Sequence, residues 1–240
     1  MRTDSAPVFL TAEWRHLAML NYEADPKLLA PFVPAGTELD LWQGKHFVSV
    51  VGFVFQKTRV LGVPIPFHRD FEEVNLRFYV RRRAPDGWHR GVVFLKELVP
   101  RVAIAWTARV IYNEPYLTLP MSHQIGNSSV EYFWRFKGKP NHLKLTVRGE
   151  AQPLRESSEA EFITEHYLGY TAQRDGSTLE YRVEHPRWRT WEAVTAELHC
   201  DIAGLYGNRF REALNRPPAS AFLAEGSAVT VRKGVKLLAK

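Results

Sequence analysis

Hydrophobic and polar residues alternate along several stretches of this chain, a pattern typical of β-strands with one face in a core. Between residues 73 and 80, aliphatic or aromatic residues at even positions alternate with Glu73, Asn75, Arg77 and Tyr79. Similar alternation predicts strands over residues 143–147 and 179–185, and the composition of 191–198 predicts another. The face carrying Glu73, Asn75 and Arg77 either lines a cavity or meets water.

Other stretches are apolar on both faces or are linked by turns. Phe47–Phe55 is apolar at successive positions, which predicts a strand covered on both sides. The run 88–98 can pair with 73–80 across the turn at Pro85-Asp86-Gly87. A mostly apolar run over 102–112 predicts a further strand, and the Ser, Gly and Asn residues in 121–130 indicate a loop.

Helical signals are few and short. Asp25-Pro26 opens a short amphipathic segment that ends near Phe32, with an N-cap residue and a first-turn proline. The serines and acids at 158–161 open a second short helix, and 207–215 predicts a third. The sum predicts an α+β fold built on a large, mainly antiparallel sheet.

Composition fits one domain over residues 1–240. The chain is 45% hydrophobic and 24% charged, which is ordinary for a globular protein with a sizeable core. Its apolar runs are too short to span a membrane and its first residues resemble no signal peptide, so we expect a cytoplasmic protein without a membrane partner. The single cysteine, Cys200, excludes an intrachain disulfide and indicates a small buried hydrophobe.

The net charge of +6 raises the question of nucleic acid binding. Basic residues are scattered, however, and the one tight cluster, Arg81-Arg82-Arg83, precedes a turn, where it indicates a solvated strand end. We therefore expect no nucleic acid partner.

Several segments together resemble one family over nearly the whole chain. They are Glu13-Trp14-Arg15-His16-Leu17, residues 20–26 and 32–37, Phe67-His68-Arg69-Asp70-Phe71-Glu72-Glu73-Val74-Asn75-Leu76-Arg77, the turn Arg109–Pro115, and Tyr181-Arg182-Val183-Glu184-His185-Pro186. This pattern resembles the acetoacetate decarboxylase-like superfamily, and within it the uncharacterised YqjF-like family, a domain of unknown function (DUF2071). The resemblance implies a strongly curved, barrel-like sheet that encloses a pocket, with a few short helices.

The resemblance also implies roles for particular residues. Arg15, seven positions before Tyr22, matches an arginine that handles the substrate carboxylate in the decarboxylases, and its planar guanidinium suits that role. The alternative is an arginine that pairs with Glu13 or another acid on the surface. Glu73 matches a glutamate that takes part in acid–base chemistry.

The same comparison argues against imine chemistry. The decarboxylases carry paired lysines after the turn proline, where this chain has Tyr116 and Leu117. A second acid of their site falls near Val48–Val50, where no carboxylate is present. Lys96, in an otherwise apolar run, could replace the missing amine if it faced a cavity, or it reaches solvent or pairs with an acid.

Histidines supply the remaining candidates. His166 and His185 each lie near tyrosines and could bind a polar small molecule, or they are structural residues. No zinc-binding spacing, phosphate-binding loop, dinucleotide motif or nucleophile elbow is present, so we expect neither a metal nor a cofactor.

The leading hypothesis is a pocket for an organic acid or carbonyl compound. Arg15 would hold the carboxylate and Glu73 would act as acid or base. The expected pocket residues are Asn75, Arg109, Tyr116, His166 and His185. An enzyme of this kind would be lyase-like or isomerase-like, with proton transfer or hydration chemistry. The alternatives are a ligand-binding or sensor module without turnover and a protein that interacts through its basic surface. Family analogy predicts a homo-oligomer.

Overall fold

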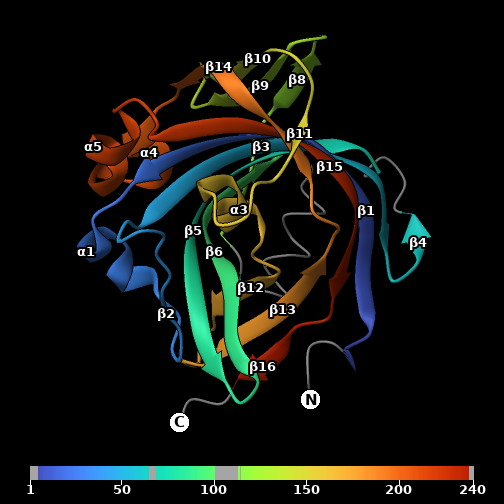
Figure 1. Ribbon diagram of the computed structural model, residues 1–240, viewed down its shortest axis with the longest axis vertical. Helices are drawn as coiled ribbons and strands as arrows, with labels where there is room; N and C mark the ends of the chain where they lie inside the picture. Colours follow the sequence, from blue (N-terminus) through green and yellow to red (C-terminus); the bar gives the residue numbers. More distant parts are fainter. Residues whose placement is uncertain (1–4, 65–68, 101–112, 114, 238–240) are drawn as a thin grey trace.

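The structure is a computed structural model that describes residues 5–64, 69–100, 113 and 115–237 (Figure 1). The run 102–112 and the candidate residue Arg109 lie outside the described residues. No helix in the described part of the chain is long and apolar enough to cross a membrane.

Residues of the short helix α3 (Glu159–Thr164) pack in the core on the concave side of a curved main sheet, for which the described residues form seven strands (Figure 1). In spatial order they are β13 (Thr178–Glu184), β12 (Leu168–Ala172), β6 (Gly87–Val99), β5 (Phe71–Ala84), β3 (Phe47–Val60), β1 (Val8–Glu23) and β15 (Ser220–Arg232). A short pairing between β13 and β15 returns the path to its start. Apart from the parallel contact of β6 with β12, these strands pair antiparallel, which confirms the predicted fold class.

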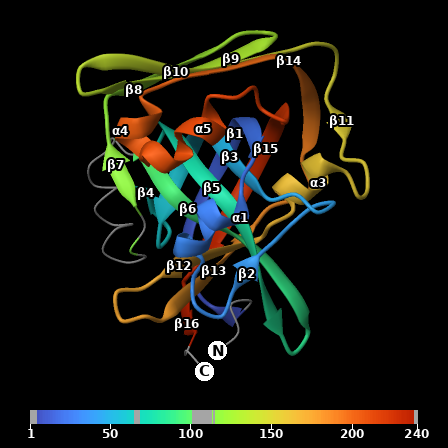
Figure 2. The same cartoon turned by 90° about the vertical axis from the view of Figure 1, so that its left-hand side faces the viewer.

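A second group of strands lies across one end of the main sheet (Figure 2). It comprises β8 (Met121–Ile125), β9 (Ser129–Phe136), β10 (Lys139–Val147) and β14 (Arg189–His199), and β14 pairs with β15. The prediction of a loop over 121–130 was wrong, because β8 pairs with β9 from Met121 to Ile125 and only the Gly-Asn-Ser stretch between them turns. Short strands border the sheets: β2 (Glu38–Leu39), β4 (Val63–Pro64), β7 (Tyr116–Thr118), β11 (Gln152–Pro153) and β16 (Val235–Leu237).

The helical segments at 26–32, 159–164 and 208–214 lie where the sequence predicts them, whereas the helix at 202–206 was not predicted. The Asp25 side chain accepts a hydrogen bond from the Lys27 amide at the start of α1 (Pro26–Leu29), which continues into η2 (Ala30–Phe32). Ser158 caps α3 (Glu159–Thr164) by accepting from the Glu161 amide. Near the C-terminal end lie α4 (Ile202–Tyr206), η3 (Asn208–Phe210) and α5 (Arg211–Leu214). These caps satisfy amides that have no partner inside the helix.

Both faces of the main sheet are covered, as the sequence of Phe47–Phe55 predicts. On β3, Val48 and Val50 belong to a core shared with the second group of strands and with α4 and α5. Phe47, Val51 and Phe53 belong to a core on the opposite, concave side, together with α3. Successive residues of a strand point to opposite faces, so one strand serves both cores.

Gly52 permits a close approach between the two groups of strands. A Cβ atom at this position would lie 2.6 Å from the ring of Tyr132, which is fully buried. The Tyr132 hydroxyl donates a hydrogen bond to the carbonyl oxygen of His16 at 2.7 Å. Because Gly52 has no side chain, Tyr132 of β9 can pack directly against β3 of the main sheet.

Candidate functional site

A cavity of about 140 Å³ lies on the concave side of the main sheet. Aromatic and aliphatic side chains make up most of its wall, among them Trp14, Phe53, Phe55, Phe71, Phe94 and Trp188. A few polar and ionisable side chains interrupt this wall, and this combination is typical of small-molecule sites.

Three of the polar residues come from alternate positions of β5. Glu73, Asn75 and Arg77 line the cavity, while Val74 and Leu76 between them are buried in the opposite core. The polar face of this strand therefore meets the cavity rather than water. The alternation seen in the sequence is what places an acid, an amide and a guanidinium side by side.

Glu73 is a buried acid with two neighbouring donors. Only 3% of the surface of Glu73 is exposed. Asn75 Nδ2 donates to Glu73 Oε1 at 3.0 Å, and the Tyr116 hydroxyl lies 3.5 Å from Oε2. Burial raises the pKa of Glu73 to about 7, although these two donors and the charge of Arg77 oppose the change. At neutral pH both protonation states are therefore accessible, as an acid–base group requires.

Arg77 offers a positive charge to the cavity. Its Nη2 donates to the carbonyl oxygen of Ile163 at 3.4 Å, and its guanidinium lies 5.7 Å from the ring centroid of Tyr79. No carboxylate in the described ranges lies within ion-pair distance of it, and its Nε is buried without a hydrogen-bond partner. A guanidinium in this state can bind an anionic ligand group.

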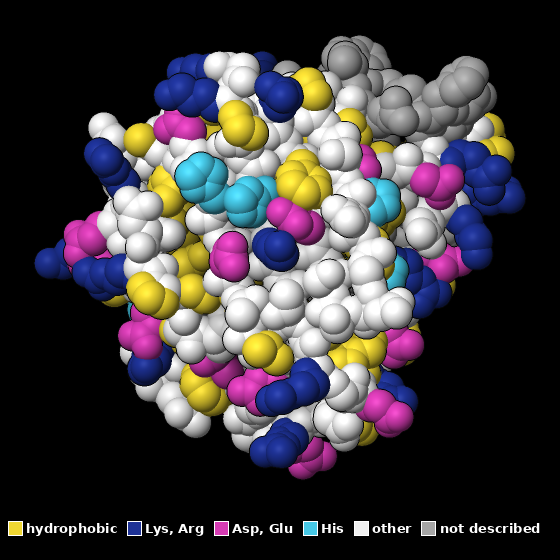
Figure 3. Space-filling view, turned by 90° about the horizontal axis from the view of Figure 1, so that it is seen from above, with side chains coloured by type: hydrophobic (Ala, Val, Ile, Leu, Met, Phe, Trp, Pro, Cys, Tyr) yellow, Lys and Arg dark blue, Asp and Glu magenta, His cyan; other side chains and the backbone are white. Residues whose placement is uncertain are grey.

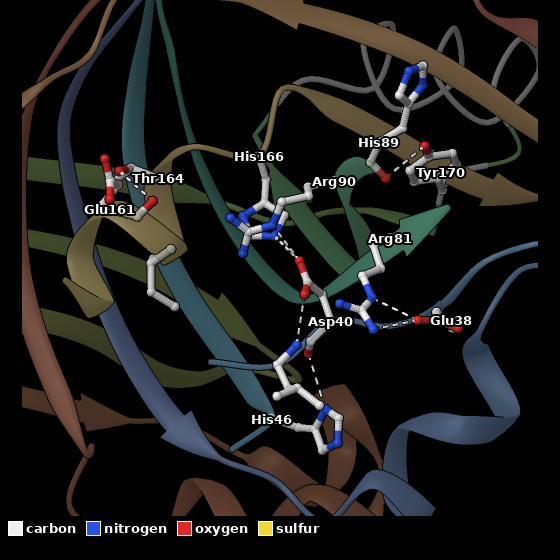
Figure 4. A network of polar contacts seen from close by, with 12 residues as sticks. Glu38, Asp40, His46, Arg81, His89, Arg90, Glu161, Thr164, His166 and Tyr170 are labelled. Atoms are coloured by element: carbon white, nitrogen blue, oxygen red, sulfur yellow. Dashed lines mark hydrogen bonds and ion pairs between the residues drawn. The ribbon is translucent and has the colours of Figure 1, made fainter. Parts of the chain in front are cut away.

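His166 follows α3 and is held by a carboxylate (Figure 4). Its Nε2 lies 3.2 Å from Asp40 Oδ2, and Arg90 Nε donates to the same oxygen at 2.6 Å. Burial raises the pKa of Asp40, but the hydrogen bonds from His166 and Arg90 outweigh this effect and lower the pKa to about 2. Burial also lowers the pKa of His166 to about 4, against the influence of Asp40. At neutral pH the pair is thus a carboxylate and a neutral imidazole.

His185 lies on another part of the cavity wall. Its ring stacks on Trp188 with centroids 4.0 Å apart, and it contacts Tyr167 at 4.7 Å. Its Nδ1 lies 2.9 Å from the carbonyl oxygen of Pro186. Burial lowers the pKa of His185, so this aromatic cluster gains no charge near neutral pH.

The structure brings most of the sequence candidates together. Glu73, Asn75, Tyr116, His166 and His185 all line the cavity.

Arg15 does not line the cavity, and its placement matches the alternative interpretation given above. Its neighbour Trp14 points into the cavity, whereas Arg15 forms an ion pair with Glu13 at 2.7 Å, and Lys57 contacts the other oxygen of Glu13. Among the described residues, Arg77 is the arginine that lines the cavity. Its position on the same strand face as Glu73 is the signal that could have identified it.

Two further expectations can be placed. Lys96 is half-buried on β6 and is not among the residues that line the cavity, so the described lining contains no lysine. In the cluster Arg81–Arg83, Arg81 pairs with Glu38 and Arg82 with the buried Glu180, so these charges are used within the fold. In the part of the chain that the structure describes, no three His, Cys, Asp or Glu side chains gather as a metal site would require.

Asp40 and Arg90 are site residues that the sequence did not indicate. The contact between Asp40 and His166 joins positions 126 residues apart in the chain. Neither residue belongs to a recognisable motif, so their role becomes visible only in the folded protein.

Comparison with known proteins agrees with the fold and the motifs. Uncharacterized protein YqjF of Bacillus subtilis (strain 168) is 26% identical over 196 residues, which cover 79% of this chain and 76% of YqjF. Among solved structures, acetoacetate decarboxylase from Legionella pneumophila is similar with a TM-score of 0.68 and 15% identity, over 99% of this chain and 90% of the other. The enduracididine biosynthesis enzyme MppR in complex with pyruvate gives a TM-score of 0.71 at 12% identity, over 98% and 92% of the two chains.

These solved structures establish an acetoacetate decarboxylase-like fold. The family model DUF2071, described as an uncharacterized conserved protein, matches residues 11–228. The match covers both the strand that carries Glu73 and the segment that carries His166. The chain therefore belongs to the DUF2071 family.

Proposed function

We propose that the cavity binds a small organic acid or carbonyl compound and that Glu73 transfers a proton to or from it. The observation that carries this proposal is the placement of Glu73, Asn75 and Arg77 on the cavity face of β5. In support, Asn75 Oδ1 and Arg77 Nε are buried there without hydrogen-bond partners among the described residues. Buried polar atoms are normally paired, so a polar ligand would complete this site.

Arg77 would hold the ligand's carboxylate and Glu73 would act beside it. The planar guanidinium can donate to both carboxylate oxygens at once, which fixes the ligand's orientation. The ionised form of Glu73 would take a proton from the carbon next to the carbonyl, and the protonated form would return it. The described lining contains no lysine to form an imine, so the proposed step is a direct proton transfer.

A related fold supports a ligand of this class. MppR, which shares the fold at low sequence identity, has been solved with pyruvate, a small keto acid.

The basic surface is a weaker basis for function. On the face seen in Figure 3, Lys and Arg side chains are interspersed with Asp and Glu rather than gathered in one patch. Nucleic acid binding needs a concentrated positive field.

The test compares two arginines with the same ligands. Calorimetric titration with pyruvate, acetoacetate and phenylpyruvate would be run on wild type, Arg77→Met and the matched control Arg15→Met. A charge-assisted hydrogen bond contributes about 1.5–3 kcal/mol, so we expect Arg77→Met to weaken binding by about 10- to 100-fold. Arg15→Met should bind as wild type does. Loss of binding in Arg15→Met alone, or no binding of any of the three acids to wild type, would contradict the proposal.

Proton transfer needs a separate readout. Exchange of the α-protons of a bound keto acid in deuterated water, followed by NMR, reports on proton abstraction directly. We expect wild type to catalyse the exchange and Glu73→Gln to bind the acid without exchanging it. Binding without exchange in wild type would favour the ligand-binding or sensor alternative, which needs the pocket and its arginine but no titrating Glu73.

A further inference from the structure

The hydrogen bond to Asp40 determines which nitrogen of His166 carries a proton (Figure 4). An ionised carboxylate can only accept, so His166 Nε2 must donate to it. Arg90 binds the same carboxylate oxygen and keeps Asp40 ionised. In the neutral imidazole the other nitrogen, Nδ1, then carries a lone pair and is a hydrogen-bond acceptor.

This acceptor has no partner within the described residues. His166 lines the cavity, its side chain is 1% exposed, and Nδ1 is buried without a hydrogen bond. The rings of Tyr79 and Phe162 pack against the imidazole at centroid distances of 4.8 and 5.0 Å, which restricts its rotation. An unpaired acceptor in such a place is unfavourable, and a ligand that brings a donor removes this penalty.

The donor group of the ligand would be close to its carboxylate. Arg77 donates to the carbonyl oxygen of Ile163, three residues before His166, and the charge of Arg77 influences the imidazole. A ligand whose carboxylate binds Arg77 therefore has its neighbouring atoms near His166. A hydroxyl on the carbon next to the carboxylate is such a donor, and its hydrogen can rotate to point at Nδ1.

The remaining wall of the cavity selects the rest of the ligand. Trp14, Phe53, Phe55 and Phe94 present aromatic surface. One water molecule needs roughly 10–15 Å³ of cavity volume. The cavity of about 140 Å³ therefore holds a ligand larger than a short acid such as pyruvate. Aromatic rings pack favourably against such a wall.

We propose that the ligand is an aryl-substituted 2-hydroxy acid whose hydroxyl donates a hydrogen bond to His166 Nδ1. This inference rests on the proposed function, because it takes the ligand's carboxylate to be bound by Arg77. It adds a specificity rule: the site distinguishes a hydroxyl hydrogen from other groups at the carbon next to the carboxylate.

The first test needs no variant. Calorimetric titration of wild type would use three probes: mandelate, phenylacetate, which lacks the hydroxyl, and α-methoxyphenylacetate, which keeps the oxygen without its hydrogen. We expect mandelate to bind about 3- to 10-fold more tightly than phenylacetate, as one hydrogen bond contributes. The methyl ether should bind no better than phenylacetate. Equal affinity for mandelate and its ether would overturn the inference.

The second test identifies the acceptor. His166→Phe keeps an aromatic ring at this position and removes Nδ1, so mandelate and phenylacetate should bind this variant with equal affinity. Nitrogen NMR of the histidine rings in wild type gives an independent check, since mandelate but not phenylacetate should shift the unprotonated Nδ1 signal. A preference for mandelate that survives in the variant would reject His166 as the acceptor.

The two proposals fail differently. If phenylacetate and mandelate bind with equal affinity and both lose binding in Arg77→Met, the anion site stands and the hydroxyl rule falls. If none of the three aryl acids binds to wild type but pyruvate does, the further inference falls and the proposed function stands. If neither these acids nor the keto acids bind, both fall.

Discussion

Replacing Glu73 by glutamine removes an acid whose ionisation the folded chain opposes. Burial raises its pKa from 4.5 to about 7. A pKa shift of one unit corresponds to about 1.4 kcal/mol. Ionising Glu73 is therefore less favourable in the folded protein than in the unfolded chain by about 3 kcal/mol. Glutamine has the same size and retains an oxygen that can accept from Asn75, so its effect on packing should be small.

The pH range of this effect follows from the direction of the change in pKa. Because the folded-state pKa is higher, the folded protein binds more protons than the unfolded chain between about pH 4.5 and 7. The stabilisation is complete below about pH 4.5, decreases as the pH rises, and is lost once the pH passes 7. Over this range wild type should therefore lose about 3 kcal/mol of unfolding free energy relative to Glu73→Gln.

Urea denaturation of both proteins at several pH values between about 4.5 and 8 measures this difference. Titrating groups that do not interact with Glu73 are common to both proteins and cancel when the two free energies of unfolding are subtracted. The slopes against urea should agree, which would show that the extent of unfolding is unchanged. A difference that stays constant across this pH range would refute a raised pKa at Glu73, and with it the acid–base role proposed for this residue.

Three further predictions concern the site and its support. Tyr116→Phe removes a donor that lowers the pKa of Glu73, so the midpoint of the pH-dependent difference described above should move upward; an unchanged midpoint would show that this long contact has no effect. Gly52→Ala places a Cβ 2.6 Å from the Tyr132 ring and should destabilise the fold by about 1–3 kcal/mol in urea denaturation. Gly226→Ala combines a φ of +81° with a Cβ 2.0 Å from a carbonyl oxygen of β1, so thermal unfolding should show a loss of more than about 2 kcal/mol, and a neutral substitution would contradict the close approach.

The strands and caps could be predicted from the sequence because they depend on neighbouring residues. The alternation around Glu73 and the apolar run at Phe47–Phe55 predict strand faces locally, and Ser158 predicts the start of α3. The pairing of β13 with β15 joins residues far apart in the chain, and no local pattern encodes it.

The candidate site follows the same division. The alternation puts Glu73, Asn75 and Arg77 on one strand face, but it does not say whether that face meets water or a cavity. Arg15 is two residues from Glu13 on the same strand face, so a local ion pair competes with any role in the interior. The pairing of Asp40 with His166 depends on how the loop after β2 packs against the segment that follows α3.

The alternation of side chains along β5 also bears on how this scaffold can diversify. Positions 73, 75 and 77 face the cavity, and positions 74, 76 and 78 pack in the core beneath the second group of strands. A replacement at one set need not disturb packing at the other, because the backbone separates them. Side chains that face the cavity can therefore be replaced one at a time while the packing contributed by the opposite face is retained.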